Sequence, residues 1–228
     1  MTVPLPLPLV LATQNPDKAR EIVEIFVRVA GAPLVAYAID DLAFLVDAPE
    51  TVARAVDALV LPSVAPDVEE TGATLEDNAR IKARALAGAL GLLAIADDTG
   101  LEVDALHGAP GVYSARYAGP GATYADNVAK LLAELDGVEP ERRTARFATV
   151  AFACTPGGRE VVARGAVEGV ITAAARGRGG FGYDPVFVPR EGDGRSFAEM
   201  SPDEKHALSH RGRAFRALAD QLTDEDSD

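Results

Sequence analysis

Two adjacent carboxylates, Asp97 and Asp98, are the residues of this sequence best suited to chemistry. They follow the apolar run 92–96, which has the length of a buried strand, and a polar group that ends such a strand emerges into a crevice. Neighbouring side chains on an extended backbone point to opposite faces. One carboxylate would therefore face a metal ion or water while the other holds the following loop. The alternative is a pair of turn or capping aspartates, and the dipeptide alone favours neither interpretation.

A polar turn at residues 13–18, TQNPDK, is the second candidate. It joins a predicted strand over 9–13 to a predicted helix over 16–30, with Asn15 as the N-cap and Pro16 at the first helical position. The first N–H groups of a helix attract anions, and Lys18 would add a positive charge there. The turn is therefore either a phosphate site or the start of an ordinary capped helix.

Two further acids, Glu69 and Glu70, lie in a turn just before a predicted helix over 75–90. Thr74 and Asp77 have the spacing of a capping box for that helix. Acids in turns are usually exposed, but Glu69 or Glu70 together with Asp98 could complete the carboxylate and water shell that Mg²⁺ needs. Spacing alone does not bring these two stretches together.

A glycine-rich basic segment, ARGRGGFGYDP, follows at residues 175–185. Its glycines predict a mobile loop, and Asp184 is held extended by the proline after it. The rings of Phe181 and Tyr183 could stack on a nucleobase, as aromatic side chains do in proteins that bind single-stranded nucleic acids. The alternative is that both rings belong to the core.

The last third of the chain predicts a helix that breaks and restarts. Ser201 is its N-cap and Lys205 lies in its first turns, while Ser209 precedes His210 and Arg211 at the break. A single histidine is more often structural than catalytic, and no acid in the sequence is placed to orient this one.

The order of predicted elements indicates an α/β fold with a mixed sheet. Strands and helices alternate early, with an extra helix opened by Pro49 within 40–66, whereas 143–155 and 159–170 form a hairpin. The 228 residues are 48% hydrophobic, so one sizeable core can be buried. No run reaches membrane-spanning length, and the N-terminus makes a poor signal peptide.

The formal net charge of −13 argues against binding to a nucleic-acid backbone, which requires a broad basic surface. A small polyanion is still compatible, because it needs only a local group of cations. The single cysteine, Cys154, excludes an internal disulfide and fits a reducing cytoplasm.

Taken together, five stretches resemble the inosine triphosphate pyrophosphatases, the RdgB-like or Ham-like family that acts on non-canonical purine nucleoside triphosphates. The stretches are LATQNPDK, EETGATLEDNARIKA, AIADDTGLEVDALHGAPGVYSARYAG, GGFGYDPVF and AEMSPDEKHALSHRG, and they occur in the family's order. The resemblance implies an α/β fold in which an elongated mixed β-sheet with flanking helices forms two lobes around a central nucleotide cleft. It also implies a homodimer, a Mg²⁺ cofactor and a cytoplasmic location. Residues 1–222 would be a single nucleotide pyrophosphatase domain, followed by an acidic tail at 223–228.

The resemblance also assigns roles to residues. Asp98 would be the proton acceptor and a metal ligand, with Glu70 as the second metal ligand unless its neighbour Glu69 takes that place. Asn15 and Lys82 would support the phosphates. The substrate-binding residues would be Thr13, Gln14, Asn15, Pro16, Asp17 and Lys18 at the triphosphate, Thr99, then Phe181, Gly182, Tyr183 and Asp184 at the base, and Lys205, His210 and Arg211.

Three features depart from the family pattern. Gln14 stands where the family usually has glycine, Thr99 replaces a serine while keeping the hydroxyl, and the segment between Tyr37 and Asp67 is longer than usual. The expected reaction is hydrolysis of ITP, dITP and XTP to the monophosphate and pyrophosphate. The alternatives are a related pyrophosphatase with another base preference, such as the Maf type, and a nucleotide-binding regulator without turnover.

Overall fold

The structure is a computed structural model, and it describes residues 9–13, 15–30, 34–37 and 68–224. Its chain divides into two units, each assembled from segments that are distant in the sequence. Unit 1 comprises Met1–Asp98, Val150–Arg164 and Ala214–Asp228, and unit 2 comprises Thr99–Thr149 and Gly165–Arg213. Three features discussed above lie outside the described residues. They are the predicted extra helix near Pro49, Gln14, and residues 225–228 of the predicted acidic tail.

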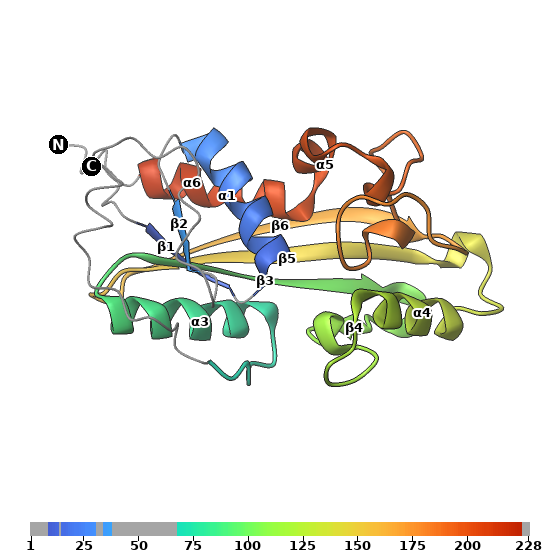
Figure 1. Cartoon of the computed structure of the whole chain (residues 1–228), viewed down its shortest axis with the longest axis horizontal. Helices are drawn as coiled ribbons and strands as arrows, with labels where there is room; N and C mark the ends of the chain where they lie inside the picture. The colour runs from blue at the N-terminus through green and yellow to red at the C-terminus, as the bar shows by residue number, and fades with distance from the viewer. Residues whose placement is uncertain (1–8, 14, 31–33, 38–67, 225–228) are drawn as a thin grey trace. The chain divides into compact units, whose positions relative to one another are not determined.

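Helices and strands alternate in the first part of the chain and strands predominate in the middle (Figure 1). In chain order the elements are β1 (Leu9–Ala12), α1 (Pro16–Ala30), β2 (Leu34–Tyr37), α3 (Leu75–Leu90), β3 (Ala94–Val103), β4 (Pro110–Gly111), α4 (Tyr124–Glu134), β5 (Thr144–Cys154), β6 (Glu160–Ile171), β7 (Phe187–Pro189), α5 (Pro202–Leu208) and α6 (His210–Asp224). Five short 3-10 helices join some of them among the described residues.

The described strands form one mixed sheet, which confirms the predicted fold class. Its order is β2-β1-β3-β5-β6-β7, with β4 pairing with β3 beside this path. The first three strands are parallel, because β1 pairs in parallel with both β2 and β3. Strands β5 and β6 form the predicted hairpin, and β7 pairs antiparallel with β6.

Unit 1 buries apolar side chains on both faces of its part of the sheet. Helices α1 and α6 cover one face and α3 covers the other (Figure 1). Ile95 of β3 packs in the cluster that contains Ile22 of α1 and Phe215 of α6. Its neighbour Ala96 packs in the cluster of α3. Alternation along β3 therefore decides which helix each of its side chains meets.

Unit 2 has its own apolar core. Leu131 of α4, Phe147 of β5 and Phe197 belong to one buried cluster there. Helix α4 begins after its N-cap Thr123, which forms a reciprocal capping box with Asp126. Helix α5 begins in the same way, with Ser201 as its N-cap and Glu204 as the capping partner.

Two expected boundaries can be compared with the structure. Ser209 separates α5 from α6, as the predicted break requires. In contrast, the prediction that a strand ends at the paired aspartates is wrong, because β3 continues to Val103. Its later residues Leu101 and Val103 are fully buried in the core of unit 2, and this burial outweighs the polar character of the residues before them.

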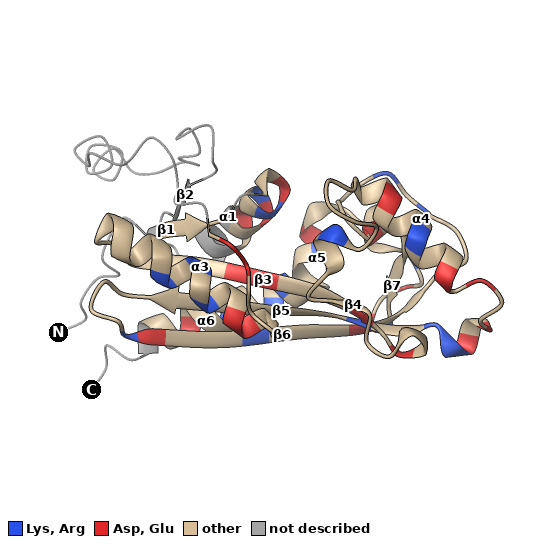
Figure 2. Ribbon diagram, turned by 90° about the horizontal axis from the view of Figure 1, so that it is seen from below, with Lys and Arg blue, Asp and Glu red and all other residues tan. Residues whose placement is uncertain are grey.

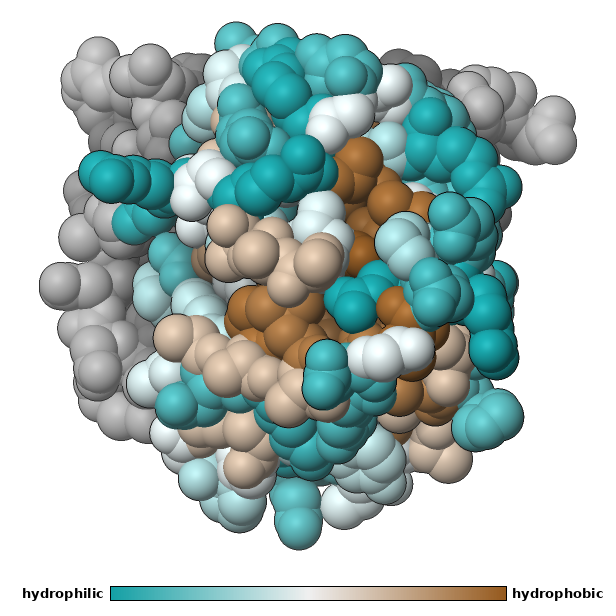
Figure 3. All heavy atoms as spheres, turned by 90° about the vertical axis from the view of Figure 1, so that its right-hand side faces the viewer, coloured by the Kyte–Doolittle hydropathy of each residue, from teal (hydrophilic) through white to brown (hydrophobic). Residues whose placement is uncertain are grey.

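Charged side chains of both signs are interspersed on the surface of unit 1. On α3 and β6, Arg80 pairs with Glu76, and Arg84 pairs with Glu160. Figure 2 shows positions of basic and acidic residues interspersed along the ribbon. The face drawn in Figure 3 has apolar side chains near its centre with hydrophilic ones around them. Within the described part of the chain, no helix combines the length and the apolar character that crossing a bilayer requires.

Candidate functional site

The paired aspartates of β3 face in opposite directions, as the sequence predicts. Asp97 shares its face of the strand with Ile95 and meets α1, where its Oδ2 lies 3.5 Å from Nζ of Lys18. Asp98 faces α3, and Lys82 Nζ lies 3.8 Å from its Oδ1. Both carboxylates are buried, at 0% and 6% exposure, so each needs such a partner.

The α3 side of β3 also carries the acid that the sequence could not identify. Lys82 Nζ donates to Glu70 Oε1 at 2.8 Å, so this one ammonium group lies within ion-pair distance of Glu70 and of Asp98. Glu69 is exposed, and its backbone carbonyl accepts the Thr71 N–H. The structure therefore brings Glu70, and not Glu69, to the carboxylate of Asp98.

Asn78 holds this arrangement together, although sequence reasoning did not select it. The side chain is fully buried, and its Nδ2 donates to Asp98 Oδ2 at 3.1 Å. Its Oδ1 accepts the Gly72 N–H at 2.8 Å. A Cβ at Gly72 would lie 2.6 Å from that same Oδ1, so only glycine allows the approach. One amide thus connects the segment of Glu70 to Asp98.

The electrostatics of unit 1 centre on Asp98. Burial raises the pKa of Asp98 above its ordinary value, and the positive charges of Lys82 and Lys18 only partly oppose this. Burial also lowers the pKa of Lys82, but the nearby carboxylates of Asp98, Asp97 and Glu70 outweigh it and the net shift is upward. Lys82 is therefore held as a cation beside the carboxylates.

The donor set of unit 1 fits Mg²⁺. Glu70 and Asp98 supply carboxylate oxygens from two segments that converge on Lys82. Mg²⁺ in nucleotide sites commonly takes one or two carboxylates and completes its shell with water and phosphate oxygens. The described residues contain no group of three or more acidic, histidine or cysteine side chains that could hold an ion without such help.

The turn at 13–18 contains the helix cap that the sequence predicts. Asn15 is the N-cap of α1, and its Oδ1 accepts from the N–H groups of Asp17 (3.0 Å) and Lys18 (3.2 Å). The N–H of Asn15 itself donates to Thr13 Oγ1 at 3.2 Å. The predicted N-cap is therefore confirmed, and side chains within the turn accept these three N–H groups. Thr13 is buried, whereas Pro16 is exposed.

In unit 2 the buried pair Asp184 and Lys205 organises the predicted base-contacting segment. Lys205 Nζ donates to Asp184 Oδ2 at 2.7 Å, with both side chains almost fully buried. The same Oδ2 accepts the Phe181 N–H at 2.8 Å. Lys205 also lies over the ring of Phe181, 4.8 Å from its centroid. Asp184 therefore fixes both the backbone and the cation at Phe181.

The glycines before Phe181 have a different role from the one predicted. Gly177 has a φ of +80°, and a Cβ there would overlap the backbone of Ala198. Gly180 has a φ of +66°, and a Cβ there would overlap the Asp184 carboxylate. The N–H groups of Arg178 and Gly179 donate to the Ala198 carbonyl. The prediction of a mobile loop is wrong, because these glycines permit close packing instead.

The predicted aromatic residues are divided between two environments. Tyr183 is buried in the core of unit 2, and its hydroxyl donates to the Ser114 carbonyl at 2.9 Å. Phe181 and Gly182 are only half-buried. Tyr124, which sequence reasoning missed, has its ring centroid 5.9 Å from that of Phe181. Phe181 is thus the aromatic residue of the FGYD segment that could meet a base, while Tyr183 anchors the segment.

Arg211 and His210 are both buried at the start of α6. Arg211 Nη2 donates to Thr99 Oγ1 at 3.1 Å, and its guanidinium lies over the ring of Phe181. Thr99 Oγ1 is also 2.6 Å from the hydroxyl of Thr149, another residue that the sequence did not reveal. The His210 ring stacks on Phe147 with centroids 4.5 Å apart. The structure therefore joins Thr99, Phe181, Lys205 and Arg211 in unit 2.

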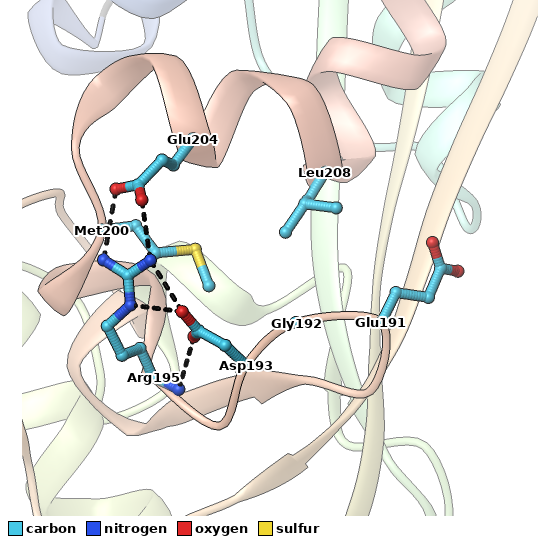
Figure 4. A pocket seen from close by; sticks show the side chains of 7 residues that line it. All are labelled: Glu191, Gly192, Asp193, Arg195, Met200, Glu204 and Leu208. Atoms are coloured by element: carbon cyan, nitrogen blue, oxygen red, sulfur yellow. Dashed lines mark hydrogen bonds and ion pairs between the residues drawn. The ribbon is translucent and has the colours of Figure 1, made fainter.

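A pocket of about 450 Å³ opens elsewhere in unit 2, and none of the predicted residues lines it (Figure 4). Arg195 crosses it to bind Asp193 and Glu204, and Met200 and Leu208 form its apolar wall. Its polar groups are thus already satisfied by ion pairs within the chain. We expect these ion pairs to stabilise the start of α5, and we do not expect the pocket to hold substrate.

Comparison with known proteins gives consistent matches over nearly the whole chain. A model of the Ham1 family matches residues 9–221. The chain is 50% identical over 216 residues to a dITP/XTP pyrophosphatase of Nitratidesulfovibrio vulgaris, which covers 92% of this chain and 93% of that protein. It is 44% identical to a dITP/XTP pyrophosphatase of Geobacter sulfurreducens, over 94% of this chain and 96% of that protein.

Solved structures agree with these matches. A HAM1 protein from Coxiella burnetii superposes with a TM-score of 0.74 at 37% identity, covering 95% of this chain and 98% of its own. A nucleoside-triphosphatase / dITP/XTP pyrophosphatase from Mycobacterium abscessus superposes with a TM-score of 0.64 at 43% identity, covering 92% of this chain and 97% of its own.

Proposed function

The chain belongs to the Ham1 family, and on that premise we propose that it hydrolyses ITP, dITP and XTP to the nucleoside monophosphate and pyrophosphate. Relatives up to 50% identical over most of the chain carry the name dITP/XTP pyrophosphatase. The chain is accordingly a hydrolase of nucleotide metabolism that acts on small-molecule nucleotides.

One observation carries the chemistry of this proposal. Asp98 is a buried carboxylate whose Oδ2 is held by Asn78 at 3.1 Å, and its Oδ1 lies beside Lys82 at 3.8 Å. A carboxylate oriented in this way can accept a proton in a defined direction. We propose that the Asp98 carboxylate is the general base that accepts a proton from the attacking water.

The balance of the reaction follows from that assignment. The water oxygen forms a bond to the α-phosphorus. At the same time the bond between the α-phosphorus and the α-β bridging oxygen breaks, and the bridging oxygen leaves with pyrophosphate. The water proton passes to Asp98. Lys18 and Lys82 provide positive charge for the oxygens that become more negative. Glu70 and Asp98 are the residues that would hold Mg²⁺, which when bound would draw charge from the phosphate oxygens.

We assign base recognition to the residues joined in unit 2. Phe181 offers a half-buried ring, and Lys205 and Arg211 place cations over it. Hypoxanthine and xanthine carry a 6-oxo acceptor, whereas adenine carries a 6-amino donor. Adenine would turn a donor, in place of an acceptor, towards these cations, and such a mismatch discriminates against the wrong substrate. This reasoning selects 6-oxopurines and leaves GTP to be distinguished at its 2-amino group.

The test is pyrophosphate release with Mg²⁺ across ITP, XTP, dITP, GTP, ATP and TTP. We expect ITP, XTP and dITP to be cleaved fastest, and Asp98→Asn to reduce kcat by about 10²- to 10⁴-fold, the range for loss of a general base. Glu69→Gln is the matched control, because Glu69 is an exposed acid of the adjoining segment. Cleavage of TTP in preference would indicate a Maf-type specificity, and binding without release would indicate a regulator. Full activity of Asp98→Asn would contradict the assignment of Asp98.

We also propose that the protein acts as a homodimer in the cytoplasm, as the family resemblance implies. The exposed Tyr113 is a large hydrophobic side chain of unit 2 that such a contact would cover. Light scattering of the purified chain tests the dimer, with a monomer at micromolar concentration as the contradicting result. Fractionation of cells that express the chain tests the location.

A further inference from the structure

The ring of Phe181 lies against side chains of two chemical types in unit 2. The Lys205 ammonium is 4.8 Å and the Arg211 guanidinium 5.6 Å from the ring centroid. The centroid of the Tyr124 ring is 5.9 Å away, and its plane is tilted by 40° from that of Phe181. Lys205 and Arg211 are only 6% and 1% exposed, whereas Tyr124 is 40% exposed. Phe181 thus lies between buried cations and an aromatic side chain that reaches solvent.

The backbone of Tyr124 is fixed relative to the segment that carries Phe181. Tyr124 is the first residue of α4 and follows the capping box formed by Thr123. One turn later, the buried Asn127 binds the backbone of segment 114–118. The Tyr183 hydroxyl donates to a backbone carbonyl of the same segment. The two rings are therefore brought together by hydrogen bonds on either side of them.

The orientation of the Phe181 ring is less firmly determined than its backbone. The Phe181 N–H donates to Asp184, but this bond does not fix the two side-chain torsions that orient the ring. The ring is half-buried, so the core constrains only part of it. A cation is attracted to the face of a ring, whereas two rings also prefer particular angles to each other. Tyr124 thus makes the contact that favours one orientation of the Phe181 ring.

We propose that Tyr124 is a positioning residue that holds the Phe181 ring in the orientation that stacks on the base of the bound nucleotide. A ring that is already held loses less conformational entropy when the base binds. The effect is on nucleotide binding and not on the chemical step, so it changes KM and leaves kcat unaltered. This inference rests on the proposed function, because it requires a base in contact with Phe181.

The experiment is a double-mutant cycle on kcat and KM for ITP with Mg²⁺. We expect Tyr124→Ala to raise KM about fivefold with kcat within about twofold, because a contact between two aromatic rings is worth a factor of this size. Tyr124→Phe keeps the ring and should stay within about twofold of the parent chain. In a Phe181→Leu background, Tyr124→Ala should change KM by less than about twofold, since Tyr124 acts through the Phe181 ring.

Lys130→Ala is the matched control for the loss of a large side chain from α4. Lys130 is also exposed, and its ammonium lies over the ring of Tyr117. We expect this variant to keep the KM of the parent chain. Urea unfolding of each variant separates changes in KM from changes in folding.

Four results would overturn the inference. They are a KM of Tyr124→Ala within about twofold of the parent, a fall in kcat without a rise in KM, a Tyr124→Phe variant as impaired as Tyr124→Ala, and a loss that persists fully in the Phe181→Leu background. An equal rise in KM for Lys130→Ala would overturn it as well, because the effect would then belong to α4 as a whole.

Failure of the proposed function is distinguishable from failure of this inference. If the parent chain releases no pyrophosphate from ITP, XTP or dITP, the proposed function fails, and the same cycle is measured as ITP affinity by calorimetry. Weaker ITP binding by Tyr124→Ala with rescue by Tyr124→Phe would still support the role of Tyr124. Equal ITP binding by all variants, or no ITP binding by the parent, would overturn it.

Discussion

Lys205 Nζ and Asp184 Oδ2 form a 2.7 Å ion pair in which the two side chains are only 7% and 4% exposed. The pair contacts the residue assigned to base recognition, since Asp184 also accepts the Phe181 N–H and Lys205 lies over the Phe181 ring. Buried charges are tolerated only when both partners are present. The site residues of unit 2 are therefore coupled to its stability.

The first prediction concerns this pair. Removing one partner by Asp184→Ala or Lys205→Ala leaves an unpaired buried charge, and we expect each to lower the free energy of unfolding by about 3 kcal/mol. The double variant should lose less than the sum of the two, because neither charge is then left alone. Urea unfolding measures all three.

The control for this prediction is the exposed pair of Lys130 and Glu134, one turn apart on α4. Breaking it should cost less than about 1 kcal/mol, because solvent screens exposed ion pairs. Strictly additive losses in the Asp184 and Lys205 double variant would show that the two buried charges do not depend on each other.

The second prediction separates the two adjacent glutamates. Glu70→Gln should raise the Mg²⁺ concentration for half-maximal pyrophosphate release by about tenfold or more, the effect seen when groups that support a metal are altered. Glu69→Gln should leave that concentration unchanged, since Glu69 is exposed and Glu70 is the acid beside Lys82. Chelation by EDTA should abolish release. Equal Mg²⁺ requirements for both variants would remove Glu70 from the metal site.

The third prediction concerns Asn78. Asn78→Ala leaves the Gly72 N–H and the Asp98 carboxylate without their buried partner, and we expect a loss of about 1–3 kcal/mol in stability. We also expect kcat to fall, because Asp98 loses its fixed orientation. Unfolding curves and initial rates measure the two effects separately.

Asn127 provides a matched comparison for Asn78. It too is a buried asparagine with two hydrogen bonds, to the Ala118 N–H and the Ala115 carbonyl. Asn127→Ala should therefore lose comparable stability with little change in kcat. If both variants reduced kcat equally, the effect of Asn78 would be one of general stability.

The fourth prediction is a pH dependence at the start of α5. Hydrogen bonds from Arg195, and then from the Ser201 backbone, lower the pKa of Glu204 from 4.5 to about 2. A carboxyl whose pKa is depressed by folding stabilises the folded state above its unfolded pKa, and this contribution is lost as the pH falls from 4.5 towards 2. The urea midpoint of the parent should therefore exceed that of Glu204→Gln at pH 7 and converge with it near pH 2. A constant difference across this range would contradict the assignment.

Much of the local structure follows from the sequence. The caps at Asn15, Thr123 and Ser201 were predictable because a short polar side chain at a helix start satisfies N–H groups a few residues away. The opposite directions of Asp97 and Asp98 were predictable because side chains alternate along any strand. Each of these features depends on residues close together in the chain, so composition and spacing suffice to identify them.

The features that sequence reasoning missed or mistook depend on distant residues. β3 continues past Asp98 because Leu101 and Val103 are buried in the core of unit 2. Gly180 appeared to confer mobility, yet it makes room for Asp184. Neither the core of unit 2 nor the close approach of Gly180 to Asp184 can be derived from the local sequence.

The sequence by itself determined the fold class, the positions of the motifs and the residue types available for chemistry. Only the tertiary structure decided that Glu70 rather than Glu69 meets Lys82, that Asn78 holds Asp98, and that Thr149 meets Thr99. The physical reason is that local preferences act over one turn or one strand. Partners such as Thr99 and Arg211, 112 residues apart in the chain, meet only where the packing of sheet and helices brings their side chains within hydrogen-bond distance.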